Sequence, residues 1–328
     1  MPPQSESVIL NGSSGKVFIA NEGNFNFANS SISLHDPETG ATISDIYKPN
    51  NNNTALGDIC QSLAIVENEL YAVVNNSQKI VVLDMNNFQK KVSINGFTSP
   101  RYTLKVSNNK IYVSNLKLTH TANQIQILNP HSKTITGAIP CRGWTEHMAL
   151  SFGNVFVTSP TSKYVYVINS ANDQITDSIL VGYGSNCIVK DKDEKLWVSF
   201  SGDSTLAELP GLAKINPITR QLESSFYFTS YQGIKDLKIN QSGTALYYLR
   251  NHVYKFDVMN PSLNTNPFIT SSGNNFYSIG VEPITENIYV SDALNYIQNG
   301  MIFVYNQQGG LSKQFNAGII PGYFIFSP

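Results

Sequence analysis

The sequence is poor in cysteine, in charge and in long apolar runs, and each shortage excludes a class of protein. Its 328 residues include three cysteines, too few and too irregularly placed for a disulfide framework or a zinc site. Only 14% of the residues are charged, 22 basic against 23 acidic, so nothing indicates nucleic acid as a partner. No stretch approaches the roughly 20 apolar residues of a membrane-spanning helix, so we expect a soluble chain.

Motifs of enzymes are missing as well. The sequence has no G-x-S-x-G, no H-E-x-x-H and no glycine-rich phosphate loop. It also shows no sustained 3.6-residue apolar period, so helix should be almost absent. We therefore expect no catalytic residues, no bound metal and no required cofactor. Cys60, Cys141 and Cys187 are interpreted as small buried apolar residues, with a Cys141–Cys187 bridge as the alternative.

What the sequence does contain is a repeat. Residues 61–94 read as four short strands separated by turns rich in Asn, Asp and Ser, and two markers of this unit recur seven times. The first marker is an aromatic residue between apolar ones in the second strand: Phe18, Tyr71, Tyr112, Phe156, Trp197, Tyr247 and Tyr289. The second is an Asx residue that opens the turn after the third strand: Asp36, Asp84, Asn129, Asn169, Asn216, Asp257 and Asn306.

The Asx markers lie 40 to 49 residues apart, which is the period of propeller blades. We predict an all-β, seven-bladed β-propeller of four-stranded antiparallel blades, a single domain over residues 1–328 with 1–5 as a tail. Blade 6 is expected to hold strands at 234–240, 245–249, 252–257 and 266–270. The inner strand of blade 1 could come from 7–10 or from 322–326. We favour the C-terminal segment, so that the two ends of the chain close the ring.

Long loops should gather on one face of this ring. They are 21–30, 114–123, 200–211 and 291–300 between second and third strands, and 48–58 between blades. The links between blades on that face bring aromatic residues to the rim, which suits a large, flat ligand held by stacking and a few polar groups. The predicted ligand-binding residues are Asn24, Phe25, Phe27, Gln61, Arg101, Tyr102, His120, Arg142, Trp144, Glu146, His147, Tyr183, Asn186, Tyr231, Gln232, Tyr277, Tyr296 and Tyr323.

Two alternatives accompany this set. Some of the aromatics, such as Phe276 and Tyr102, would instead be apolar pegs between blades. Glu22, Asn24, Asn186 and Asp236 could hold a hard divalent cation in the axial channel, as in propeller lactonases.

Several phrases resemble a known family. Asn21-Glu22-Gly23-Asn24-Phe25, the run from Leu56 to Ser62, Val74-Asn75-Asn76-Ser77 and Ser99-Pro100-Arg101-Tyr102 resemble the YncE-like, DUF5074-type seven-bladed propellers of Bacteroidetes. Many members are exported lipoproteins, and the BtuG-type members capture cobalamin for an outer-membrane TonB-dependent transporter. The resemblance implies an exported protein, lipid-anchored at the cell surface or periplasmic, whose signal segment is absent from this chain.

The leading hypothesis is therefore a monomeric, non-enzymatic propeller that binds cobalamin or another corrinoid and passes it to an outer-membrane transporter. The alternatives are a metal-dependent lactonase-like hydrolase and a protein-interaction scaffold of a surface complex.

Overall fold

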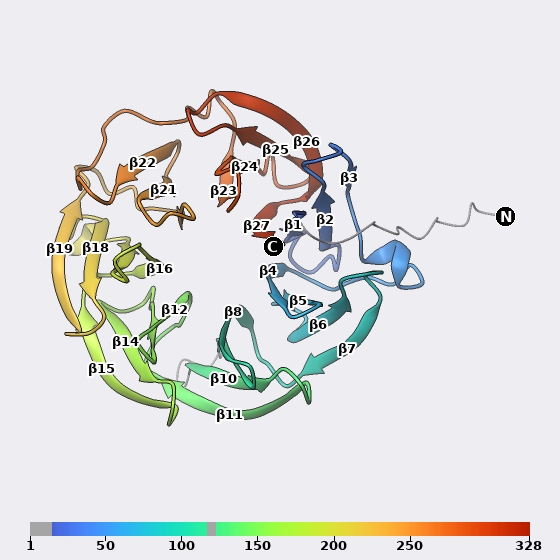
Figure 1. Ribbon diagram of the computed structural model, residues 1–328, viewed down its shortest axis with the longest axis horizontal. Helices are drawn as coiled ribbons and strands as arrows, with labels where there is room; N and C mark the ends of the chain where they lie inside the picture. Colours follow the sequence, from blue (N-terminus) through green and yellow to red (C-terminus); the bar gives the residue numbers. More distant parts are fainter. Residues whose placement is uncertain (1–14, 117–122) are drawn as a thin grey trace. The chain divides into compact units, whose positions relative to one another are not determined.

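The computed structural model describes residues 15–116 and 123–328, and it shows seven antiparallel sheets that follow one another along the chain (Figure 1). The fold is an all-β, seven-bladed propeller, as predicted. Among the described residues the only helices are two 3-10 turns, η1 (Lys48–Asn50) and η2 (Ser204–Leu206). No helix in this part of the chain is long and apolar enough to cross a membrane.

The chain groups into two compact units, which we describe separately. The first unit comprises Met1–Arg101, Asn274–Gly280 and Ile288–Pro328, and the second comprises Tyr102–Gly273 and Val281–Asn287. The prediction of one domain over the whole chain stays a prediction.

The first unit carries three sheets. The sheet of blade 1 has the order β27-β1-β2-β3, and the other two run in chain order. Their strands are β1 (Val17–Asn21), β2 (Ser31–His35) and β3 (Thr42–Ile43), with β27 (Pro321–Phe326); β4 (Cys60–Val66), β5 (Glu69–Val74), β6 (Lys79–Asp84) and β7 (Lys90–Asn95); and β23 (Phe276–Val281), β24 (Ile288–Asp292), β25 (Asn299–Tyr305) and β26 (Leu311–Ile319).

The second unit carries four sheets, each in chain order. Their strands are β8 (Pro100–Ser107), β9 (Lys110–Asn115), β10 (Asn123–Asn129) and β11 (Thr134–Cys141); β12 (Met148–Ser151), β13 (Asn154–Val157), β14 (Tyr164–Asn169) and β15 (Gln174–Leu180); β16 (Ser185–Lys190), β17 (Leu196–Phe200), β18 (Gly211–Asn216) and β19 (Gln221–Tyr227); and β20 (Asp236–Ile239), β21 (Ala245–Leu249) and β22 (Val253–Asp257).

Blade 6 departs from the prediction, because the strand expected at 266–270 is not formed. Only Ile269 bridges to Val253, and the backbone bonds there are confined to Phe268 and Ile269. Pro267 lacks an N–H group, so this segment cannot complete a regular ladder. Blade 6 therefore keeps three strands, while the other six blades have four.

The C-terminal segment supplies the inner strand of blade 1, as we favoured. Strand β27 pairs antiparallel with β1, with Val17 opposite Phe326 and Ala20 opposite Tyr323. The competing segment 7–10 lies outside the described residues.

The structure explains both repeat markers. The aromatic residue of the second strand is at most 2% exposed in all seven blades. Apolar clusters between neighbouring sheets of a unit contain Phe18, Tyr112, Phe156, Trp197 and Tyr289. Each Asx residue accepts a hydrogen bond from the backbone N–H two residues further on, which starts the turn. The three cysteines are buried and free, so the alternative Cys141–Cys187 bridge is not formed.

Candidate functional site

Hydrogen bonds join the loops of the first unit that follow its outer and second strands. Asp58, in the link before β4, accepts from the backbone N–H of Asn26 at 2.8 Å and from the side chain of Asn76 at 2.5 Å. Asn75 donates from its side chain to Ser99 Oγ and to the Pro100 carbonyl, both at 2.9 Å. The predicted grouping of these loops at one edge is therefore present within this unit.

The loop between β1 and β2 presents two aromatic rings to solvent. Phe25 is 64% exposed and Phe27 is 74% exposed. The backbone beneath them is ordered, because Asn29 Oδ1 accepts from the Asn24 N–H at 2.7 Å. Gly23 has φ +75°, and a Cβ there would lie 2.5 Å from Asn29 Oδ1, so only glycine fits this turn. The exposed rings thus stand on a loop with a defined conformation.

A third exposed ring comes from the loop after β24. Tyr296 is 43% exposed, and its carbonyl accepts from the side chain of Asn24 at 2.5 Å. Its ring meets Tyr277 edge to face, with centroids 6.0 Å apart. Asn24, Phe25, Phe27, Tyr277 and Tyr296, all predicted for the site, are thus brought together; we call this set the aromatic cluster.

Next to Tyr277 of the aromatic cluster lies the half-buried carboxyl group of Glu22. The hydroxyl of Tyr277 lies 3.0 Å from both carboxylate oxygens of Glu22 and donates to them. Burial raises the pKa of Glu22, and the Tyr277 hydrogen bond and the charge of Arg101 offset only part of that rise. Burial next to this carboxylate raises the pKa of Tyr277 in turn. A Cβ on Gly322 would lie 2.5 Å from Glu22 Oε1, so glycine is needed for this close approach.

Arg101 and Gln61 adjoin the same region of the first unit. The guanidinium of Arg101 donates to Gln61 Oε1 at 2.6 Å, and Ser62 Oγ donates to the Arg101 carbonyl at 2.7 Å. Tyr323, on β27, is half-buried against the apolar cluster of blades 1 and 2. The first unit therefore brings a guanidinium, a carboxyl group, side-chain amides and exposed aromatic rings into one region where a ligand could bind.

In the second unit the predicted residues fall into smaller groups. Tyr102 stacks on His147 with centroids 3.9 Å apart. Trp144 is exposed, and its backbone N–H donates to Thr161 Oγ1 at 2.9 Å. Arg142 is also exposed, and its carbonyl accepts from the Tyr166 hydroxyl. Glu146 is only 3% exposed, which makes it a poor ligand contact.

Two of the remaining predicted residues of this unit accept hydrogen bonds through their backbone carbonyls. The Asn186 carbonyl accepts from Thr158 Oγ1 at 2.5 Å, and the Gln232 carbonyl accepts from Arg250. Tyr231 is about half exposed, and Tyr183 lines a cavity described below. His120 lies outside the described residues. In the first unit, Phe276 is 2% exposed, which fits the interpretation as an apolar peg.

The residues considered for a cation have other partners. Asp236 accepts from Lys238 at 2.5 Å and from the Leu237 N–H. Across residues 15–116 and 123–328, no three His, Cys, Asp or Glu side chains are grouped as a metal site would need.

The predicted binding set omitted Glu22, Asp58 and Asn76, although all three stand in the phrases on which the family resemblance rests. It also omitted Phe200, Glu208 and Tyr227 of the second unit. Phe200 and Glu208 stand in the long loop predicted at 200–211, whereas the sequence shows no distinguishing signal for Tyr227.

Solved structures similar to this one share its fold. They include a quinoprotein alcohol dehydrogenase-like protein of Bacteroides thetaiotaomicron, at 14% identity and a TM-score of 0.72, covering 96% of this chain and 78% of that one. A periplasmic gluconolactonase of Pseudomonas aeruginosa has 12% identity and a TM-score of 0.71, with 96% and 99% covered. A protein of Lactobacillus plantarum has 15% identity and a TM-score of 0.70, with the same coverage.

Identities this low establish the fold alone. A comparison with curated proteins found no match. A family model described as a domain of unknown function (DUF5074) matches residues 15–326, and the chain therefore belongs to that family.

Proposed function

We propose that this protein is a non-catalytic ligand-binding propeller of the cell surface or periplasm, and that its ligand is cobalamin or another corrinoid. The observation that carries the proposal is the pair Phe25 and Phe27, exposed on a loop whose backbone is held by Asn29 and Asp58. Large apolar rings that remain in water on an ordered loop are typical of a binding surface. Because the loop is already ordered, binding does not have to meet the entropic cost of ordering it.

The chemistry around the rings suits such a ligand. A corrinoid is large and flat, with apolar faces and amide groups at its rim. The aromatic cluster offers ring faces for stacking, while Asn24, Gln61 and Arg101 supply polar groups that would set its orientation. The family resemblance supports delivery of the ligand to an outer-membrane TonB-dependent transporter, in keeping with the BtuG-type members.

Titration calorimetry with cyanocobalamin tests the proposal directly. We expect micromolar or tighter binding, weakened at least about tenfold in the double variant Phe25→Ala/Phe27→Ala, since each ring contributes on the order of 1 kcal/mol beyond its buried area. Phe152→Ala is the matched control, because Phe152 is an equally exposed phenylalanine (57%) in the hairpin turn between β12 and β13. Absence of binding at micromolar cyanocobalamin would refute the corrinoid proposal.

Transfer to a transporter needs its own test. The protein should copurify with an outer-membrane TonB-dependent barrel from its native membranes when cyanocobalamin is present. Copurification with a barrel but no corrinoid binding would instead favour the scaffold hypothesis.

The pair Glu22–Tyr277 favours a second candidate, a lactonase-like hydrolase. A carboxyl with a raised pKa beside a phenol is a possible acid–base pair, and a gluconolactonase shares the fold. A lactone hydrolysis assay with and without added divalent metal, on the wild type and Glu22→Gln, decides it. Metal-dependent turnover that Glu22→Gln abolishes would establish the hydrolase.

A further inference from the structure

A cavity of about 320 Å³ lies beside the fifth sheet, within the second unit. Its walls come from the link between β15 and β16, the ends of β17 and β19, and the long loop between β17 and β18. Three aromatic residues dominate the lining, together with two aliphatic side chains and one carboxylate: Tyr183, Phe200, Tyr227, Ala207, Leu209 and Glu208. The volume is at the lower end of the range for small-molecule sites.

Two glycines let the aromatic wall come close to the backbone. A Cβ on Gly182, which has φ +142°, would lie 2.6 Å from Phe200 Cδ2. A Cβ on Gly211 would lie 2.7 Å from Phe200 Cζ and 2.2 Å from the Phe226 carbonyl oxygen. The rings of Phe200 and Tyr227 meet in a T-shaped arrangement, at 5.6 Å between centroids and 71° between planes. Tyr227 remains 57% exposed at the mouth.

The loop that completes the cavity is ordered by its own hydrogen bonds. The backbones of Asp203 and Glu208 exchange two bonds, at 2.8 and 2.9 Å. The Asp203 carboxylate also accepts from the Thr205 N–H at 2.9 Å. The Gly202 N–H donates to the Tyr183 carbonyl at 2.9 Å, which ties the loop to the opposite wall. The walls are thus formed before any ligand arrives.

The charge of the cavity selects the kind of ligand. Its one acidic lining residue, Glu208, forms an ion pair with Lys163, so the two charges cancel. A charged ligand would find no uncompensated charge there, so no ionic interaction would offset the free energy that it loses on dehydration. A neutral ligand with hydroxyl groups can instead donate to the carboxylate of Glu208, which lines the cavity, and exchange hydrogen bonds with the hydroxyls of Tyr183 and Tyr227.

We propose that this cavity is a carbohydrate subsite that takes one neutral sugar ring. The C–H face of the ring would lie on Tyr227 and Tyr183, and its hydroxyls would bond the carboxylate of Glu208. Such a site goes beyond the corrinoid proposal, although Tyr183 was predicted for the corrinoid set. Through this site the protein would bind weakly to free monosaccharides or to the sugar units of a surface glycan.

Saturation-transfer NMR and calorimetry on the full chain test this with glucose, galactose, mannose and N-acetylglucosamine at millimolar concentration. A polysaccharide retention assay separates glycans from free sugars as the source. We expect at least one sugar to bind, with Tyr227→Ala weakening it about tenfold. Glu208→Gln, which keeps the shape of the side chain, should also weaken it. The matched control is Tyr164→Ala, an exposed tyrosine (42%) of β14 outside the lining.

Three results would overturn the proposal: no binding of any of the four sugars, sugar binding unchanged in Tyr227→Ala, or binding of indole and benzyl alcohol at the cavity without any sugar. Thermal unfolding of each variant shows whether a loss of binding reflects a loss of fold. Cyanocobalamin titration of the same samples is independent, so failure of the sugar site and failure of the corrinoid proposal are distinguished.

Discussion

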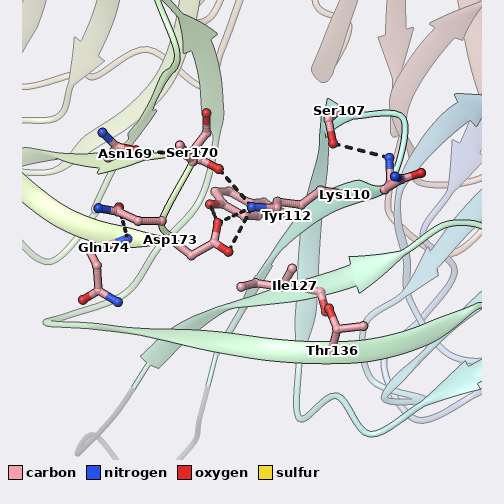
Figure 2. A network of polar contacts seen from close by, with 12 residues as sticks. Ser107, Lys110, Tyr112, Ile127, Thr136, Asn169, Ser170, Asp173 and Gln174 are labelled. Atoms are coloured by element: carbon pink, nitrogen blue, oxygen red, sulfur yellow. Dashed lines mark hydrogen bonds and ion pairs between the residues drawn. The ribbon is translucent and has the colours of Figure 1, made fainter.

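The ammonium group of Lys110 lies 2.7 Å from Oδ1 of Asp173, although the two residues belong to different blades of the second unit. Lys110 begins β9, and Asp173 stands in the turn between β14 and β15. Lys110 also donates to the Ser170 carbonyl at 2.9 Å, and the buried Tyr112 donates its hydroxyl to the same carboxylate (Figure 2). One carboxylate therefore connects blade 3 to blade 4 through two donors.

Removing the charge of Asp173 should weaken this connection. Asp173→Asn keeps the shape of the side chain and tolerates the local φ of +59°, but it replaces charged hydrogen bonds by neutral ones. We expect the free energy of unfolding to fall by about 1–2 kcal/mol, measured by urea denaturation. Asp177→Asn is the control, since Asp177 is more exposed and lies 3.7 Å from Arg220, and its loss should cost at most about 0.5 kcal/mol. Equal effects of the two variants would contradict the assignment.

Glu22 should make the folded state less stable as the pH rises. Its folded pKa is raised by burial, so the folded protein holds this proton more tightly than the unfolded chain does. The loss of free energy of unfolding is absent below the ordinary pKa of 4.5. It appears as the pH rises above that value and is complete above the pKa of Glu22 in the folded protein. Glu22→Gln should therefore be more stable than the wild type at neutral pH and no more stable near pH 4.

Denaturant unfolding across this pH range measures the effect, with the exposed residue Glu38 replaced by glutamine as the control. A stability difference between Glu22→Gln and the wild type that does not change with pH would contradict the prediction.

His35 should produce the opposite slope. It is 1% exposed, stacks on Phe315 at 4.1 Å, and shares a hydrogen bond with Thr42 at 3.0 Å. Burial, aided by the charge of Lys313, lowers its pKa from 6.5 to about 4. The unfolded chain therefore binds this proton first, and stability is lost as the pH falls from 6.5 toward 4, by about 3 kcal/mol.

His35→Gln, which cannot titrate there, should flatten this part of the pH–stability curve even if it lowers stability at neutral pH. The outcome against the prediction is an unchanged slope between pH 6.5 and 4. His131→Gln is the control, because His131 is exposed in the turn after β10.

The three thiols should be unreactive in the folded protein. Burial raises the pKa of Cys141 and of Cys187 to about 12 and that of Cys60 further, so almost no thiolate is present at neutral pH. We expect Ellman's reagent to modify none of them under native conditions and all three in urea. Rapid modification of the native protein would place a thiol at the surface. Reaction of a single thiol in urea without reductant would reveal a disulfide.

The sequence by itself determined the repeating unit, because that unit rests on short-range chemistry. An Asx residue starts a turn through a bond to its own backbone two residues on, and a central aromatic residue is buried wherever two blades pack together. Both signals are local, so all seven copies could be counted and the fold class predicted. Exposure of Phe25 and Phe27 also followed from a long polar loop. The absence of a regular fourth strand in blade 6 was missed, although Pro267 is visible in the sequence.

Only the tertiary structure decided which distant residues meet. Glu22 and Tyr277 are 255 residues apart, and Asn24 and Tyr296 are 272 residues apart. Neither pairing has a sequence period, because each depends on how the ends of separate strands come together. For the same reason Glu146 became buried while Trp144 stayed exposed, and Phe200, Glu208 and Tyr227 came to line one cavity. Burial and pairing of this kind set the pKa of Glu22 and the charge of that cavity, and so the chemistry that each can perform.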